Sequence, residues 1–278
     1  MVTVLITIHI MLVIAMIVLV LLQRSEGGAL GIGGGGGGGS SVSPSGPSVT
    51  FPVNGNTSFA GTAATASFET DTATGKITQS VPDGPIDSNM TVTTSNGKVI
   101  AISAEAAGSK VNVDQRRGDI ASSMGVLASV ETRDGNNFAI VVDPSKTTLQ
   151  HQTFGAWIDG GGGKGTVGAG SYGNKTNVAN LPRRNASYTG ASVGMARLDD
   201  GDRHVTASRV KVDTDFVTAR ISSTDTIAVN LRTRASNTTP DLDFSGSGLV
   251  SGAGFKANIS GNGTIGQANG VFYGPTAN

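Results

Sequence analysis

The chain has 278 residues, among them 41 glycines and no cysteine, and its 20 basic residues balance its 20 acidic residues. The lack of cysteine excludes disulfide bonds and attachment of a lipid through a thiol. The balanced charge does not favour a nucleic-acid partner, which usually needs a basic patch, and the paired arginines at 116–117 and 183–184 are expected to be solvated loop charges.

Residues 1–22 contain no Asp, Glu, Lys or Arg, and their only polar side chains are Thr3, Thr7 and His9. A helix of this length would span about 33 Å, enough for a hydrocarbon core of about 30 Å. The segment is therefore predicted to be a transmembrane helix rather than a buried core helix. No basic residue precedes it and no small-residue cleavage site follows it, as a secretory signal would require. Arg24, which follows the helix, favours the cytoplasmic side of the membrane.

Two stretches at the front of the chain carry a resemblance, Val-Leu-Ile-Thr-Ile-His-Ile at 4–10 and Val-Leu-Leu-Gln-Arg-Ser-Glu-Gly-Gly-Ala-Leu-Gly-Ile-Gly-Gly-Gly at 20–35. They resemble SecG, the small two-helix subunit of the bacterial protein-export channel. The resemblance covers residues 1–39 and implies contact with other subunits of the Sec translocon. It places six residues in a cytoplasmic, channel-facing loop: Gln23, Arg24, Ser25, Glu26, Gly27 and Gly28. Unlike SecG, this chain has no second apolar run of about 18 residues after the glycine tract.

Residues 23–50 are rich in Gly, Ser and Pro and are predicted to form a flexible linker. The glycine run at 33–39 matches a dinucleotide-binding pattern only by composition, because no strand–turn–helix context surrounds it. A second run, at 160–165, lacks the Ser or Thr that must follow the lysine of a phosphate-binding loop. Neither run is predicted to bind a nucleotide, and the second is expected to be a loop.

From residue 51 onward, short runs rich in Val, Ile, Thr and Phe alternate with Gly, Asn and Asp, which is typical of an all-β protein. Asn96-Gly97, between residues 90–95 and 98–105, predicts a hairpin with a tight turn. Asp134-Gly135-Asn136 predicts a second hairpin. It joins residues 125–132 to residues 137–143. Further strands are expected at residues 205–216, 217–221, 226–232, 242–244 and 255–259.

The part of the chain after the apolar segment offers little chemistry. Its only histidines are His151 and His204, and its carboxylates are scattered singly, so no nucleophile–base pair or metal-ligand spacing is recognisable. We therefore expect no enzymatic activity, no cofactor and no nucleic-acid partner. Tyr172, Tyr188 and Tyr273 could serve iron or haem, but packing is the more common role for tyrosines in strands and loops.

A second resemblance rests on motifs in the C-terminal half: Thr-Phe-Gly-Ala-Trp at 153–157, Ala-Gly-Ser-Tyr-Gly at 169–173 and Gly-Val-Phe-Tyr-Gly-Pro at 270–275. In that order they resemble the β-barrel domain of transferrin-binding protein B and related surface lipoproteins. The resemblance covers about residues 150–278 and implies capture of a host iron carrier or haem protein through loops at one end of the barrel. Its most specific residues, expected to be structural, are Gly270, Phe272, Tyr273, Gly274 and Pro275. Members of that family continue into a closing strand, so we expect a barrel that lacks its last strand and keeps an open edge.

The fold class that we expect is mainly β. It combines one N-terminal transmembrane helix, a Gly-rich linker, an antiparallel β handle region and a β-barrel of about eight strands. The expected domains are a transmembrane helix at 1–22, a linker at 23–50, a handle-like region at 51–150 and a barrel at 151–278.

Three functions stay open. The favoured one is a membrane-anchored, non-enzymatic ligand-binding protein that resembles surface receptors for a host protein. The N-terminal helix predicts the bacterial inner membrane as its location, and the barrel resemblance gives the cell surface or outer membrane as the alternative. The alternative function is a SecG-type subunit of the export channel in the inner membrane, and the third is a membrane-anchored β domain with neither role. The first two conflict in topology, because a SecG-like insertion would leave the β region in the cytoplasm. We interpret the glycine tract as the join between two formerly separate proteins.

Overall fold

The computed structural model describes residues 48–74, 76–106, 108–147, 149–161, 163–198, 200–262, 264–275 and 277. The predicted transmembrane helix and nearly all of the predicted linker lie outside these residues. Within the described residues, no helix has the length and apolar character needed to cross a bilayer.

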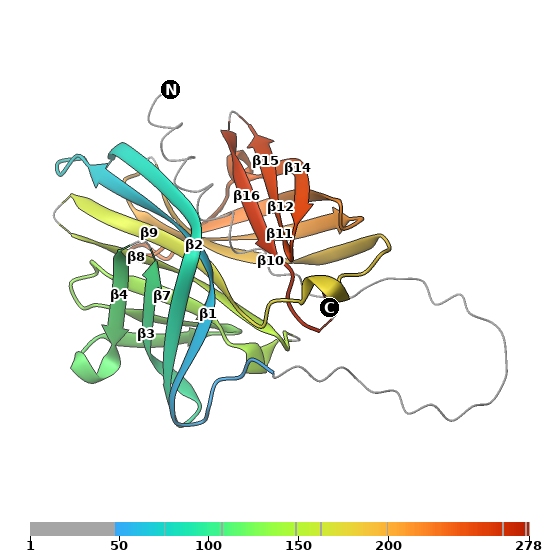
Figure 1. Ribbon diagram of the computed structural model, residues 1–278. Coiled ribbons are helices and arrows are strands. Elements are labelled where there is room, and N and C mark those ends of the chain that lie inside the picture. Colours follow the sequence, from blue (N-terminus) through green and yellow to red (C-terminus); the bar gives the residue numbers. More distant parts are fainter. Residues whose placement is uncertain are drawn as a thin grey trace.

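The described chain is mainly β, as expected, and forms two antiparallel sheets (Figure 1). The first sheet has nine strands in the order β4-β3-β2-β1-β9-β8-β7-β6-β5. These strands are β1 (Gly55–Thr70), β2 (Ile77–Ser95), β3 (Lys98–Ala106), β4 (Ser109–Asp114), β5 (Ile120–Met124), β6 (Leu127–Glu131), β7 (Phe138–Val142), β8 (Gln152–Gly161) and β9 (Lys164–Gly173).

The second sheet has the order β10-β11-β12-β14-β15-β16, with the short β13 paired to β12. Its strands are β10 (Ala186–Arg197), β11 (Arg203–Thr214), β12 (Thr218–Asn230), β13 (Ser236–Thr238), β14 (Phe244–Ser251), β15 (Gly254–Gly261) and β16 (Thr264–Val271). Single 3₁₀ turns lie between strands: η1 (Gln115–Arg117), η2 (Pro144–Lys146), η3 (Val178–Asn180) and η4 (Pro240–Leu242).

Both predicted hairpins are confirmed. Asn96 and Gly97 have φ angles of 52° and 71°, the left-handed values that a tight turn between β2 and β3 requires. The second hairpin joins β6 to β7, and its turn is held by the Asp134 carboxylate, which accepts from the hydroxyl of Thr132 at 2.6 Å and from the backbone N–H of Asn136 at 3.0 Å.

Three predictions were wrong in detail. Residues 217–221 and 226–232 were expected to be two strands, but β12 is continuous from residue 218 to 230. Residues 222–224 pair regularly with β11, and a bulge opposite Ser208 accommodates Asp225 and Thr226. The expected strand at 242–244 begins only at Phe244, since Pro240 starts a 3₁₀ turn that ends at Leu242. The glycine run at 160–165 is not simply a loop. Its ends continue β8 and β9, with Gly160 paired to Gly165.

The strands in the middle of the first sheet are buried on both faces. Phe138, Ile140 and Val142 of β7 face a large core that they share with the second sheet. Ala139 and Val141, which alternate with them, face a smaller core formed within the first sheet. All five residues are buried, so β7 shows no polar alternation.

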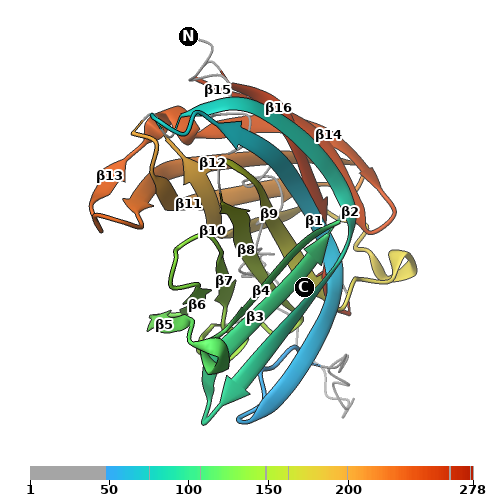
Figure 2. The ribbon, with the colours of Figure 1, turned by 90° about the vertical axis from the view of Figure 1, so that its left-hand side faces the viewer.

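The side chains of β8 alternate between the two cores in the same way. Phe154, Ala156 and Ile158 pack into the larger core, while Trp157 packs into the smaller one. The first sheet curves around the smaller core as a half-barrel. The second sheet and strands β1, β7, β8 and β9 of the first sheet together enclose the larger core as a nearly closed barrel (Figure 2). The predicted division after residue 150 falls between β7 and β8, which pair with each other. It stays a prediction.

Gly168 tests the packing of the smaller core. A Cβ atom on Gly168 would lie 2.2 Å from the indole ring of Trp157. We expect Gly168→Ala to lower the free energy of unfolding by about 1–3 kcal/mol, because the ring has no room to move in a buried core. Urea unfolding followed by circular dichroism measures the change. Ser67→Ala, an exposed position on the neighbouring β1, should change the same quantity by less than about 0.5 kcal/mol. Equal effects of the two substitutions would contradict the packing argument.

Candidate functional site

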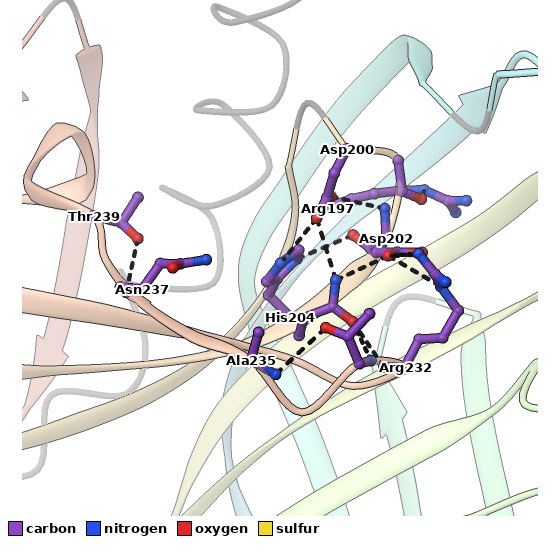
Figure 3. A network of polar contacts seen from close by, with 11 residues as sticks. Arg197, Asp200, Asp202, His204, Arg232, Ala235, Asn237 and Thr239 are labelled. Atoms are coloured by element: carbon purple, nitrogen blue, oxygen red, sulfur yellow. Dashed lines mark hydrogen bonds and ion pairs between the residues drawn. The ribbon is translucent and has the colours of Figure 1, made fainter.

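A network of charged and polar side chains lies at one end of the second sheet (Figure 3). Two connections meet there. One, between β10 and β11, includes residues 198 and 200–202, and the other, residues 231–235, joins β12 to β13. These two connections lie close together because β11 and β12 pair up to this end of the sheet, where His204 of β11 lies opposite Asn230 of β12.

The connection from β10 to β11 is a tight turn. Its final rung pairs Arg197 with Arg203, and Gly201 has a φ of 75° that suits glycine. The Gly201 N–H donates to the Leu198 carbonyl at 2.9 Å, and the Asp202 N–H donates to Oδ1 of Asp200 at 2.9 Å. The sequence Asp-Gly-Asp at 200–202 therefore orders its own turn, as Asp and Gly commonly do.

Asp202 is the centre of the network. Its carboxylate accepts from Nε of Arg232 at 3.0 Å and from Nδ2 of Asn230 at 2.8 Å. The Arg232 guanidinium, and after it the Asn230 amide, lower the pKa of Asp202 to about 2. Asn230 also orders the second connection, because its Oδ1 accepts from the backbone N–H groups of Arg232 and Thr233 at 2.8 and 2.9 Å.

His204 is buried beneath the turn, with 2% of its surface exposed. Its Nε2 lies 3.3 Å from Oδ2 of Asp200, and its Nδ1 lies 3.2 Å from the carbonyl oxygen of Asp202. Both partners are acceptors, so both contacts are hydrogen bonds only when the imidazole carries a proton on each nitrogen.

Arg203 connects this end of the second sheet to the first sheet, and Arg197 lies opposite it. Nη2 of Arg203 lies 3.3 Å from Oε1 of Glu131, the last residue of β6. Nη1 of Arg203 is buried and has no hydrogen-bond partner among the described residues. Arg197, opposite Arg203, donates from Nε to the Gly201 carbonyl at 2.9 Å. Burial, and after it the charge of Arg203, lowers the pKa of Arg197.

The outer members of the network face solvent. The side chain of Arg232 is 72% exposed and that of Asp200 is 47% exposed, although both are held by hydrogen bonds. Exposed charges in a fixed arrangement can form ion pairs with a macromolecule at little entropic cost. In the part of the chain that the structure describes, no group of three or more His, Asp or Glu residues could hold a metal ion.

The site residues named from the sequence lie elsewhere. Gln23, Arg24, Ser25, Glu26, Gly27 and Gly28 are outside the described residues. The other five, Gly270, Phe272, Tyr273, Gly274 and Pro275, lie at and beyond the end of β16, where the second sheet meets the first.

Phe272 belongs to an aromatic cluster in the larger core, and Gly270 lies against this cluster. The ring centroid of Phe272 is 5.2 Å from that of Phe216. It is 6.1 Å from the centroids of Tyr188 and Phe255. The Phe255 ring also covers Gly270, where a Cβ atom would lie 2.1 Å from it. The Tyr188 hydroxyl donates to the Ala277 carbonyl at 3.0 Å, and burial raises the pKa of Tyr188 to about 12.

Tyr273 connects the second sheet to β9. It is 5% exposed, and its hydroxyl donates to the Ser171 carbonyl at 2.9 Å and accepts from Oγ of Ser171 at 2.6 Å. Burial raises the pKa of Tyr273 to about 12. The Gly274 N–H donates to the Asn174 carbonyl at 2.9 Å, which extends the connection beyond β9. Tyr172, the third tyrosine, is fully buried in the smaller core.

The loop network around Asp202 was not predicted from the sequence. The available signal was the density of charge in Asp-Gly-Asp-Arg-His at 200–204 and in Asn-Leu-Arg-Thr-Arg at 230–234. These two segments lie almost thirty residues apart, so nothing local shows that Asp202 meets Arg232. The pairing follows from the register of β11 and β12.

The family model for the preprotein translocase SecG subunit matches residues 2–51, which confirms that the N-terminus is SecG-like. No curated protein matches the chain.

Among solved structures, a single-residue variant of transferrin-binding protein B from Haemophilus parasuis Hp5 matches with 9% identity. It covers 84% of this chain and 72% of that one, with a TM-score of 0.35. A double variant of the same protein matches with 12% identity, covering 84% and 71% of the two chains, with a TM-score of 0.30.

Asp202→Asn tests the centre of the network. Because the folded carboxyl has a lower pKa than an unfolded one, its contribution to stability is complete above about pH 4 and is lost as the pH falls through about 2. We expect the substitution to lower the free energy of unfolding by about 1–2 kcal/mol at pH 7, since a charged hydrogen-bond acceptor is lost beside a largely exposed arginine. The difference from the unsubstituted chain should shrink between about pH 4 and 2.

Chemical unfolding across this pH range measures the difference in the free energy of unfolding, with the exposed Asp87→Asn as the control. A difference that is independent of pH would refute the assignment.

Proposed function

We propose that this chain is a membrane-anchored, non-enzymatic binding protein whose β region holds a protein ligand at the loop end of its second sheet. The single observation that carries the proposal is the ordered set of exposed charges around Asp202 and Arg232. Binding residues commonly lie on loops that a rigid scaffold positions.

The loop end suits recognition because its charges are fixed before a ligand arrives. Asp202, Asn230 and the turn at 200–202 hold Arg232 in one place. Arg234, in the same connection, is exposed. Fixing side chains in advance lowers the entropy lost on binding, and an arrangement of both charge signs favours a partner of complementary pattern.

The ligand class in this proposal is a host iron carrier or haem protein. It comes from the resemblance of residues 150–278 to the barrel of transferrin-binding protein B. The membrane anchor in the proposal is the uncharged segment 1–22, whose length suits a bilayer.

Binding of transferrin or haemoglobin by the full chain in lipid nanodiscs tests the proposal. We expect one of these proteins to bind in surface plasmon resonance, and Arg234→Glu to weaken that binding by about tenfold, as reversal of a charge at an interface does. The binding should also weaken as the salt concentration rises.

Arg220→Glu is the matched control, since Arg220 is an exposed arginine near the other end of β12. It should leave the affinity unchanged. The proposal fails if neither protein binds above empty nanodiscs, or if both substitutions weaken binding equally.

A second candidate function is a SecG-type subunit of the protein-export channel. The family-model match at residues 2–51 favours it. In this case the loop at 23–28 would lie beside the channel on the cytoplasmic side, and the β region would follow it into the cytoplasm.

A reporter fused after Asn278 distinguishes the two candidates. Alkaline phosphatase folds to an active enzyme only when it is exported, because it needs disulfide bonds. The binding function requires high phosphatase activity, whereas the export-channel function requires an inactive phosphatase and a fluorescent cytoplasmic reporter at the same position. A fusion that lacks residues 1–22 serves as the non-inserted control.

A further inference from the structure

A groove runs along the edge of β16, on elements that are not part of the loop network. It has a volume of about 270 Å³. One wall is formed by β14, β15 and β16, and the other by Thr62 of β1, Pro85 of β2 and Ser171 of β9. The groove therefore lies where the second sheet meets the first.

Three side chains stand in a row across the first wall. Leu249 of β14 lies opposite Lys256 of β15, which in turn lies opposite Asn269 of β16. Directly opposed residues have Cβ atoms about 4.5–5.5 Å apart and share one face of the sheet. The row thus presents an apolar group, a cation and an amide in that order.

Each of the three side chains lacks a complementary group within the described protein: an apolar contact for Leu249, an anion for Lys256 and a hydrogen-bond acceptor for Asn269. Leu249 is 69% exposed, although it is a large apolar residue. Lys256 is exposed and forms no ion pair with any residue that the structure describes. Nδ2 of Asn269 is buried and has no hydrogen-bond partner among the described residues. Buried amide groups are nearly always paired, so this one calls for an explanation.

The described residues that line the groove carry no acidic side chain, and Lys256 is their one basic group. Val271, at the end of β16, contributes a further apolar side chain to the lining. We propose that this groove binds a small molecule with an apolar body and one carboxylate. The carboxylate pairs with Lys256 and, once the half-buried Asn269 side chain turns its buried Nδ2 toward the groove, accepts from that amide, and the body covers Leu249.

The volume and the donor set define this class of ligand. Pockets for drug-sized molecules measure about 300–1,000 Å³, so this groove suits a shorter one. A single cation and a single amide donor satisfy one carboxylate. A phosphate group carries a charge of about −1.5 to −2, which the single positive charge of Lys256 would neutralise only in part.

Calorimetric titration of the full chain in neutral lipid nanodiscs tests the proposal, with heats from empty nanodiscs subtracted. The probes are 4-phenylbutanoate, its neutral amide 4-phenylbutanamide and the cation 4-phenylbutylamine, which share one apolar body. We expect the carboxylate to bind at least about tenfold more tightly than the amide and the amine, because only it is complementary to Lys256.

Variants separate the site from general damage to the fold. Asn269→Ala should weaken binding of the carboxylate by at least about fivefold and leave the affinity for the amine unchanged. Lys256→Glu should invert the preference, so that the amine binds more tightly than the carboxylate, a result that unfolding cannot produce. Lys98→Glu, which reverses an exposed lysine in the first sheet, is the control and should alter neither affinity.

A groove that holds only water would show no difference among the three probes. That result overturns the proposal, as does retention of the carboxylate preference in Lys256→Glu. If the carboxylate bound to all variants with equal affinity, its binding site would lie elsewhere on the chain, and the proposal would likewise be overturned.

Discussion

Burial of the strands β7, β8 and β9 on both faces is the constraint on which the rest of the structure depends. Alternate residues of β8 belong to different cores, with Trp157 in the smaller and Phe154 in the larger. Neither core can form without these strands, because each uses one of their faces. The two curved sheets are therefore joined by shared packing, and Gly168 is small so that the indole of Trp157 can lie against its backbone. A strand that serves two cores tolerates few changes of volume.

The loop network and the groove both follow from how the second sheet meets the first. Arg203 reaches Glu131 of β6 because β11 begins beside the turn that follows β6. Tyr273 reaches Ser171 because the chain beyond β16 returns to β9. At the first of these junctions charged side chains are paired around Asp202, and at the second Asn269 is left without a partner. We place the protein-binding role at the first junction and the small-ligand role at the second.

Local signals predicted those parts of the fold that local geometry controls. Asn96-Gly97 and the turn around Asp134 specify their hairpins because they adopt left-handed angles or accept the hydrogen bonds of the turn themselves. The same reasoning failed for β12, where the apparent break between two strands is a bulge. Whether an irregular stretch ends a strand depends on the neighbouring strand, which local sequence does not contain. The loop network was missed for this reason, since Asp202 and Arg232 meet only through the register of β11 and β12.

The sequence by itself determined the β class, the places of the tight turns, the absence of disulfides and the SecG-like character of the N-terminus. Each of these depends on residue type and short spacing. Only the tertiary structure decided that β7 and β8 serve two cores, that Asp202 holds Arg232 and that Asn269 faces a groove without a partner. These features require residues far apart in the chain to be close in space, and that proximity arises from the pairing and curvature of whole sheets.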